Sequence, residues 1–138
     1  MRPFNIIVRL KRGKLELKRK DVVICYSYFT LDKYQLTVTD INTTRRYRRR
    51  GYGSILMHVL MGVAKSKKVP IYLYSLSDAI KFYEKLGFVR LRRYRNGWYR
   101  GKRVVIDNLN VRKTFGEQTN KTDVVWIPDN VHIVHLCI

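Results

Sequence analysis

Acidic residues are scarce in this chain. Only 10 of its 138 residues are Asp or Glu, against 29 Lys and Arg, which gives a formal net charge of +19. Such an excess of one sign repels itself in a compact fold, so we expect an anionic partner to offset it. Long-range repulsion also disfavours strongly cationic substrates such as polyamines, aminoglycosides and histone tails.

Cysteines and long apolar runs are also rare. The two cysteines, Cys25 and Cys137, are too few for a disulfide framework and lack metal-ligand spacing, so we expect reduced, buried thiols rather than one disulfide. No apolar run approaches the ~18 residues of a membrane span, and residues 1–5 lack a secretory pattern. These absences predict a cytoplasmic protein that does not enter membranes. His132 and His135 would lie on opposite faces of a strand, so no metal is predicted.

The length predicts one domain over residues 1–138 with a buried core. Alternating or β-branched stretches bounded by turn residues predict strands over residues 4–10, 15–18, 22–31 and 34–43. No helical period appears before Ser54. The first helix is predicted over residues 53–67, with a stripe of apolar side chains at Ile55, Leu56, Val59, Leu60 and Val63.

The second half of the chain is predicted to alternate strands with one further helix. Ser77 is the expected N-cap of that helix, which ends near Leu86 with Gly87 as a left-handed terminator. Asn96-Gly97 favours a two-residue hairpin turn. The remaining predictions are a polar loop over 112–123 and strands over 71–74, 88–94, 99–108, 124–127 and 131–136, of which the last two could mediate a homodimer.

A glycine turn between the strand 35–41 and the first helix is the most informative feature. Gly51 and Gly53 allow backbone angles that other residues avoid, and let a ligand approach the main chain. The helix that follows offers unpaired N–H groups and the positive end of its dipole. This arrangement predicts a site for a pyrophosphate, although an ordinary helix-entry turn would have the same spacing.

Two motifs resemble the GNAT N-acetyltransferases. Ile41-Asn42-Thr43, Tyr47 and then Arg48-x-x-Gly51-x-Gly53 are similar to the acyl-CoA-binding motif Q/R-x-x-G-x-G/A. The run 79–88, AIKFYEKLGF, is similar to the family's late helix and following strand. The resemblance covers roughly residues 34–106. It implies an α/β (α+β) GNAT fold with a central mixed, mostly antiparallel twisted sheet of about six to seven strands, two main helices and a reduced N-terminal helical region.

The resemblance implies acetyl-CoA (CoA) as the cofactor. Main-chain amides of the turn would hold the pyrophosphate, and the pantetheine arm would lie along the strand before it. The cofactor-binding residues implied are Ile41, Asn42, Thr43, Arg48, Arg49, Arg50, Gly51, Tyr52, Gly53, Ser54 and Ser77. The sequence departs from the family at Leu76, where an asparagine often contacts pantetheine; Ser75 or Ser77 are the candidate substitutes.

Tyr83 matches the tyrosine that protonates the leaving sulfur in many members of the family. Its alternative is a core tyrosine beside Phe82. Asp40, at the end of the strand expected beside the thioester, is the candidate catalytic base, with Glu84 or water as alternatives. Both carboxylates are also compatible with a structural role.

Basic residues interleaved with aromatics predict contact with nucleic acid, since cations bind phosphates while rings stack on bases. The alternative is that the rings pack inward while the charges face water. The predicted nucleic-acid-binding residues are Arg45, Arg46, Arg90, Arg92, Arg93, Arg95, Arg100, Lys102 and Arg103.

The leading hypothesis is an N-acyltransferase that uses acetyl-CoA on an acceptor that is, or is attached to, nucleic acid. By resemblance the acceptor is aminoacyl-tRNA, as in toxin-like members, or a DNA base, as in phage Mom-like members. The alternatives are a weak or inactive GNAT-fold protein that binds nucleic acid, and a protein N-acetyltransferase.

Overall fold

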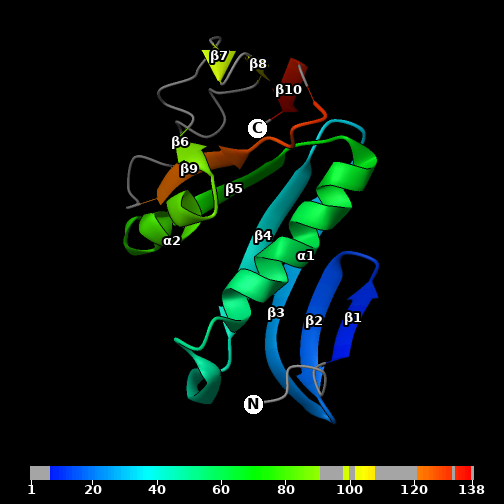
Figure 1. Cartoon of the computed structure of the whole chain (residues 1–138), viewed down its shortest axis with the longest axis vertical. Helices are drawn as coiled ribbons and strands as arrows, with labels where there is room; N and C mark the ends of the chain where they lie inside the picture. The colour runs from blue at the N-terminus through cyan, green and yellow to red at the C-terminus, as the bar shows by residue number, and fades with distance from the viewer. Residues whose placement is uncertain (1–6, 91–97, 100–101, 108–120, 132, 138) are drawn as a thin grey trace.

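A computed structural model describes residues 7–90, 98–99, 102–107, 121–131 and 133–137. These residues form a seven-stranded sheet and a three-stranded sheet (Figure 1). In spatial order the large sheet contains β1 (Ile7–Lys11), β2 (Lys14–Arg19), β3 (Val22–Leu31), β4 (Leu36–Thr43), β5 (Ile71–Leu76), β9 (Lys121–Trp126) and β6 (Val89–Arg90). The small sheet contains β10 (Ile133–Cys137), β8 (Lys102–Asp107) and β7 (Trp98–Tyr99).

Two α-helices accompany the sheets, and a short 3₁₀ helix precedes each. The order along the chain is η2 (Arg45–Tyr47), α1 (Tyr52–Lys67), η3 (Ser77–Ala79) and α2 (Ile80–Lys85). In the large sheet β4 and β5 run parallel, whereas the other neighbouring strands are antiparallel. A mixed, mostly antiparallel sheet of seven strands with two helices confirms the predicted fold. None of the described helices is long and apolar enough to cross a bilayer.

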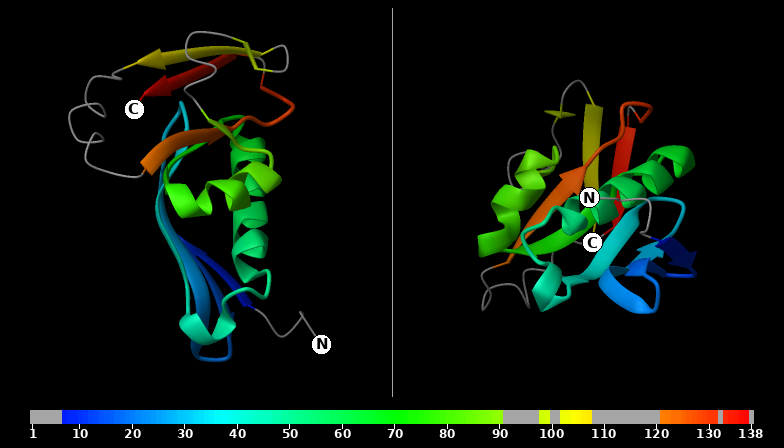
Figure 2. Two further views of the ribbon diagram at one scale, coloured as in Figure 1. Left: turned by 90° about the vertical axis from the view of Figure 1, so that its left-hand side faces the viewer. Right: turned by 60° about the horizontal axis from the view of Figure 1, so that its bottom comes forward.

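Strands β1 to β4 form a continuous antiparallel meander. A turn at Arg12–Gly13 joins β1 to β2, and Gly13 adopts a positive φ of 73°. No helix lies between β1 and β4, which confirms the reduced N-terminal helical region. One face of this meander packs against α1, and Figure 2 shows no described helix on the other face.

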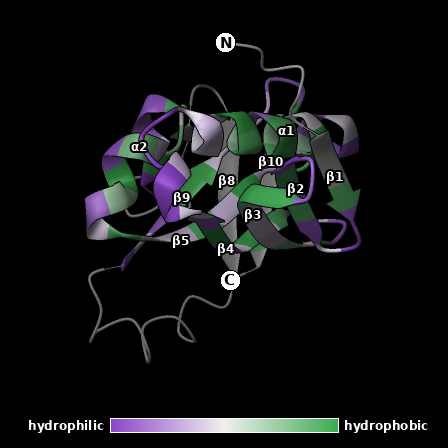
Figure 3. Cartoon of the chain, turned by 90° about the horizontal axis from the view of Figure 1, so that it is seen from below, coloured by the Kyte–Doolittle hydropathy of each residue, from purple (hydrophilic) through white to green (hydrophobic). Residues whose placement is uncertain are grey.

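The core lies between α1 and the large sheet (Figure 3). The helix has the predicted span, and the predicted stripe is confirmed at Leu56, Val59, Leu60 and Val63, which are buried or pack against the core. It is wrong at Ile55, which is 40% exposed. Met57 and Met61 pack into the core instead, because the unbranched methionine side chain adapts to gaps beneath a helix. The buried face of α1 consists of Leu56, Met57, Leu60, Met61 and Ala64.

The helix ends differ in how well the sequence predicted them. Gly87 has a φ of 101°, and its N–H bonds the carbonyl of Glu84 at 3.0 Å, so the predicted left-handed terminator is confirmed. The predicted Ser77 cap is wrong. Ser77 is itself the first residue of η3, and no side chain caps η3 or α2, because the 3₁₀ turn leads directly into the helix.

The predicted hairpin across Asn96-Gly97 is wrong in its pairing. β6 pairs with β9, and β7 pairs with β8. β9 comes from far along the chain and begins inside the predicted loop, at Lys121, because it pairs with the edge of β5. Residues 91–97 lie outside the described residues. β10 corresponds to the last predicted strand, one of the two expected to mediate a homodimer. It pairs with β8 of the same chain.

Candidate active site

Strands β4 and β5 separate at their carboxyl ends. Their parallel pairing covers only Leu36–Val38 and Ile71–Leu73, although β4 continues to Thr43. A β-bulge at Thr39 coincides with the point of separation. Bulges bend a strand and re-aim its side chains. From Thr39 onward, the edge of β4 that faces β5 therefore has main-chain groups available to a ligand.

The turn between β4 and α1 is rich in arginine, and we call residues 45–50 the arginine turn. Arg49 has a φ of 63°, and Gly51, the N-cap of α1, has a φ of 84°. Alternation of left-handed residues in a turn directs successive N–H groups into a concavity that binds anions. The left-handed Arg49 costs of order 1 kcal/mol, so strain is stored beside the helix entrance.

The amino end of α1 is open to a ligand. No side chain caps it, and its first turn contains no acidic residue. The first N–H groups of an α-helix lack partners within the helix. A Cβ atom added to Gly51 would meet nothing within 4 Å, so this backbone faces open space. The geometry of the turn fits a phosphate-bearing ligand.

Hydrogen bonds fix the arginine turn against the sheet. The Thr44 N–H and hydroxyl donate to the carbonyls of Ile24 and Val23 in β3, both at 2.8 Å. Arg48 Nε donates to the carbonyl of Thr43 at 2.9 Å, so this arginine closes the turn as well as contributing charge. The turn is therefore held in place before any ligand binds.

A cleft of about 410 Å³ opens in front of this turn, and we call it the turn cleft. It gathers most of the predicted cofactor residues and adds Tyr47 and Phe82, which sequence reasoning missed as site residues although both stand in the quoted motifs. The predicted residues that line it are Ile41, Asn42, Thr43, Arg48, Arg49, Gly51, Tyr52, Gly53 and Ser54, together with Tyr83.

A second cavity, of about 240 Å³, lies where β4 and β5 diverge, and we call it the strand gap. Asp40 lines this gap and not the turn cleft, whereas Ile41 and Tyr83 line both. The gap also contains Lys121 of β9, which sequence reasoning missed because a strand distant in the sequence delivers it. Lys121 Nζ lies 5.4 Å from the centre of the Tyr74 ring.

Tyr83 stands at the boundary of the two cavities. Its side chain is 5% exposed, and its ring makes edge-on contacts with Phe82 and Phe88 at centroid distances of 5.1 and 5.6 Å. Burial raises the pKa of Tyr83 to about 12. The phenol therefore stays protonated at neutral pH and keeps its hydrogen for donation.

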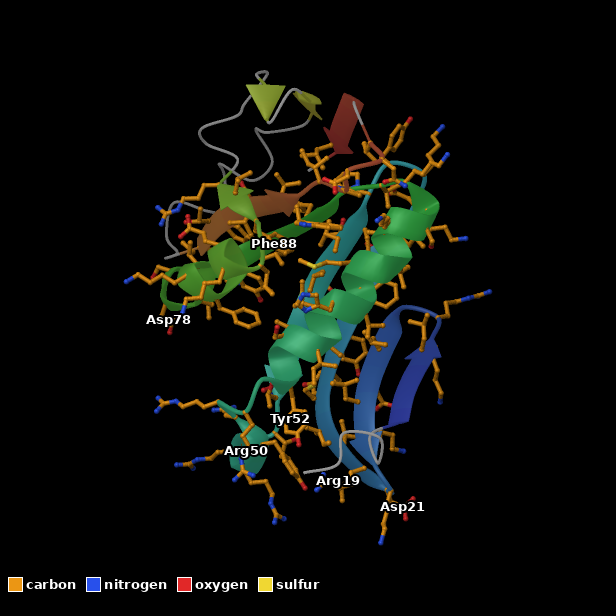
Figure 4. The ribbon with its side chains drawn as sticks, in the orientation of Figure 1. Arg19, Asp21, Arg50, Tyr52, Asp78 and Phe88 are labelled. Atoms are coloured by element: carbon orange, nitrogen blue, oxygen red, sulfur yellow. The ribbon has the colours of Figure 1, made fainter. Side chains whose placement is uncertain are left out.

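Other predicted site residues lie outside these cavities. Arg50 is exposed, and Figure 4 shows its side chain directed away from the helix. Ser77 is exposed and lines neither cavity, whereas the neighbouring Ser75 lines the strand gap and donates to the carbonyl of Leu76 at 2.8 Å.

The predicted nucleic-acid residues divide into three groups. Arg45 and Arg46 are exposed on η2. Arg90 pairs with Glu84 at 3.5 Å, which offsets its charge. Arg92, Arg93, Arg95 and Arg100 lie outside the described residues, and only the β8 backbone is described for Lys102 and Arg103.

Among the described side chains, no group of three His, Cys, Asp or Glu could hold a metal ion.

A strained turn at a helix entrance, next to a gap between two diverging parallel strands, is the class of site that suits a CoA-dependent acyltransferase. The family model described as "Acetyltransferase (GNAT) family" matches residues 16–88. That span is more than half of the 138 residues, and the chain belongs to this family. It is therefore an acetyltransferase of the GNAT type, for which acetyl-CoA is the cofactor. No curated protein sequence matches the chain.

Solved structures with the same fold include Ard1 from Thermoplasma volcanium, with a TM-score of 0.59 and 17% identity over 83% of this chain and 70% of that one. Arabidopsis thaliana Naa50, in complex with the bisubstrate analogue CoA-Ac-MVNAL, has a TM-score of 0.58 and 19% identity over 83% and 72%. Neisseria gonorrhoeae N-acetylglutamate synthase, with coenzyme A and N-acetyl-glutamate, has a TM-score of 0.60 and 12% identity over 88% and 29%. At such identities the likenesses establish the fold alone.

Proposed function

We propose that this acetyltransferase modifies an amine carried by nucleic acid, either on a DNA base or on aminoacyl-tRNA. The observation that carries the proposal is the net charge of +19, with more exposed arginines beside the turn cleft than the cleft itself contains. Of the five arginines in the arginine turn, Arg48 and Arg49 line the cleft. The other three, Arg45, Arg46 and Arg50, are available to a second polyanion.

The turn cleft is the proposed cofactor site. The amides from Arg49 to Ser54 would bind the pyrophosphate, and Arg48 and Arg49 would add positive charge. The unpaired edge of β4 from Ile41 to Thr43 would hold the pantetheine arm. A Cβ atom at Gly53 would lie 3.6 Å from Phe82 Cζ, so larger side chains there would narrow the cleft.

The strand gap is the proposed acceptor site. Acetyl-CoA supplies a thioester-activated acetyl group when bound. Asp40 lines the gap and is the group assigned to take a proton from the acceptor amine. Tyr83 reaches both cavities, so its hydroxyl is assigned to donate to the departing sulfur.

The acidity of Tyr83 defines how it acts. A thiol such as that of cysteine has a pKa of about 8.5. Complete proton transfer from a phenol with a pKa of about 12 would be uphill by roughly 5 kcal/mol. Tyr83 therefore stabilises negative charge on sulfur mainly through a hydrogen bond.

Two basic segments, the arginine turn and the β2–β3 turn, lie at the same end of the molecule. The Thr44 bonds place η2 beside the start of β3, which follows the β2–β3 turn. Figure 4 shows Arg19 at the same end as Arg50, with Asp21 as the acidic residue nearby. Phosphates of a nucleic acid are the polyanion that such a surface fits.

The direct test is transfer of radiolabelled acetyl from acetyl-CoA to separate preparations of aminoacyl-tRNA, single- and double-stranded DNA, and peptides. We expect label in nucleic acid or its attached aminoacyl group. Label confined to peptides would refute the proposed acceptor and leave the acetyltransferase activity intact.

Acetylation of a protein N-terminus is the second candidate. It is favoured by the shared fold with Naa50, which was solved with a peptide-based bisubstrate analogue.

The third candidate is a nucleic-acid-binding protein with weak catalysis. It is favoured by Leu76, which is 54% exposed at a position where the family often has an asparagine that contacts pantetheine. Acetyl-CoA well above its Kd should raise the Tm of a true cofactor binder. No shift, with nucleic acid still bound, would support the third candidate.

A further inference from the structure

The face of the meander opposite α1 carries a regular array of polar and aromatic residues. Alternation along β3 sends Ser27 and Phe29 into the core, at 0% and 8% exposed, and leaves Tyr28 42% exposed on the other face. Cross-strand neighbours share a face. The register therefore places two rows on this surface, Lys14–Tyr28–Asp40 and Glu16–Tyr26–Asn42.

The two tyrosines of the array are held in fixed positions. Their rings pack edge to face, with centroids 5.5 Å apart and an interplanar angle of 74°. Lys14 Nζ lies 5.6 Å from the Tyr26 centroid and 5.1 Å from that of Tyr28. The same ammonium pairs with Glu16 at 3.2 Å. Hydrogen bonds to Tyr28 and to Glu16 raise the pKa of Lys14.

This array is continuous with the strand gap. Tyr28 is the cross-strand partner of Asp40, and Asp40 lines the gap. The Thr39 hydroxyl donates to the carbonyl of Tyr28 at 3.1 Å, which ties the bulge to this position of β3. Directly opposed residues on neighbouring strands have Cβ atoms about 4.5–5.5 Å apart. A planar group on the Tyr28 ring would therefore lie next to Asp40.

We propose that Tyr28, supported by Tyr26 and Lys14, is a stacking platform for a nucleobase adjacent to the acceptor amine. The proposal rests on the proposed function in one respect, namely that the acceptor is attached to nucleic acid. An exposed ring held by its neighbours suits a base, because stacking needs only a π-face and tolerates any base. None of the described helices covers this face (Figure 2).

Tyr34 provides a matched control within the same chain. It is 40% exposed, and Lys33 Nζ lies 5.0 Å from the centre of its ring, so its exposure and its cation resemble those of Tyr28. However, Tyr34 precedes β4, whereas Asp40 is four residues beyond the first residue of that strand. At about 3.3 Å per residue, these four residues separate Leu36 from Asp40 by ~13 Å, and Tyr34 lies in the turn before Leu36.

The experiment measures binding of a short single-stranded oligonucleotide containing 2-aminopurine, whose fluorescence falls on stacking, to the full chain. We expect Tyr28→Ala to weaken binding about 5- to 150-fold and to reduce quenching. Tyr28→Phe and Tyr28→Trp should preserve both, and Tyr34→Ala should change neither. A Tm within a few degrees of that of the unaltered chain verifies that each variant is folded.

Several results would overturn the platform. These are unchanged binding in Tyr28→Ala, equal losses in Tyr28→Phe and Tyr28→Ala, equal losses in Tyr34→Ala, or absence of oligonucleotide binding. Tyr28-dependent binding of a tryptophan-containing peptide in place of the oligonucleotide would assign the ring to a protein acceptor. Loss of the acetyl-CoA-dependent rise in Tm, measured in parallel, would signal failure of the cofactor assignment rather than of the platform.

Discussion

The two cavities that meet at Ile41 and Tyr83 are built in different ways. Most of the turn cleft comes from one continuous segment, residues 41–54, and its central features are main-chain groups in a turn and at a helix end. The strand gap is assembled from β4, β5, η3, α2 and β9, so its side chains come from positions as far apart as Asp40 and Lys121.

This difference separates what is common to the reaction from what is particular to the acceptor. Backbone amides bind a diphosphate whatever the neighbouring side chains are. An acceptor is recognised by side-chain chemistry, which can change at one strand without disturbing the other cavity. We therefore expect substitutions in the turn cleft to affect acetyl-CoA binding, and substitutions in the strand gap and on the face of Tyr28 to affect the acceptor.

The largest effect is expected at the boundary between the cavities. Tyr83→Phe removes one hydroxyl and keeps the ring that packs on Phe82 and Phe88. Loss of a positioned donor typically slows a reaction 10²–10⁴-fold, and we expect kcat to fall by about 10²–10³ with little change in the KM for acetyl-CoA. Steady-state kinetics with both substrates varied will measure this.

Tyr47→Phe is the control for Tyr83→Phe, because Tyr47 lines only the turn cleft. It should leave kcat within a few-fold of its starting value. Because the pKa of Tyr83 is about 12, its ionisation should not reduce kcat between pH 7 and 10. Full activity in Tyr83→Phe would show that another group stabilises the leaving sulfur.

The sequence predicted the turn cleft better than the strand gap for a physical reason. Gly51, the strand before it and the helix after it lie within one local segment, where spacing reports geometry directly. Lys121 and the Tyr28–Asp40 pair depend on strand register across the sheet, which local patterns do not specify. The β6–β9 pairing was missed on the same grounds, because a distant strand replaced the local partner.

The second prediction concerns Cys25, which lies beneath the turn cleft. Its side chain is fully buried, and its Sγ donates to the carbonyl of Tyr52, in the first turn of α1, at 3.7 Å. Burial raises the pKa of Cys25 from 9.0 to about 11. The folded state therefore holds this proton more tightly than the unfolded state does. The resulting contribution to the free energy of unfolding is fully present below pH 9 and is lost as the pH rises from 9 to about 11.

Two pKa units correspond to roughly 2–3 kcal/mol. Denaturant unfolding of the unaltered chain and of Cys25→Ala across pH 8–11.5 isolates this contribution, since other groups titrate in both. We expect the alanine variant to lose less stability than the unaltered chain over this range. Parallel curves would mean that the thiol is hydrated and that the floor of the cleft is open to water.

A pair of glycines in and before α1 tests the turn itself. Gly51 has a φ of 84° with open space around its Cα, so Gly51→Ala should cost about 1–2 kcal/mol from backbone strain alone. Gly62 lies inside the helix with nothing within 4 Å of an added Cβ, so Gly62→Ala should add roughly 0.5–1 kcal/mol. Denaturant unfolding should show effects of opposite sign. Stabilisation by Gly51→Ala would contradict the left-handed turn and the anion site built on it.

The smallest effects, below about 1 kcal/mol per residue, are expected from exposed arginines. Arg45 and Arg46 do not line the turn cleft, and neither pairs with a carboxylate among the described residues. Arg45→Gln and Arg46→Gln should each lower the slope of log affinity against log salt by about 1 for nucleic acid, while acetyl-CoA affinity stays the same.

Arg49→Gln distinguishes binding of acetyl-CoA from binding of nucleic acid, because Arg49 lines the turn cleft. Arginine and glutamine have a similar free-energy cost in the left-handed conformation at position 49. The difference in acetyl-CoA affinity between the unaltered chain and Arg49→Gln therefore reports the effect of the charge. We expect weaker acetyl-CoA binding from this variant, measured by calorimetry at two salt concentrations. If Arg45→Gln and Arg46→Gln weakened acetyl-CoA binding as much as Arg49→Gln, the whole arginine turn would serve the cofactor. The positive charge would then no longer support a nucleic-acid acceptor at this end of the molecule.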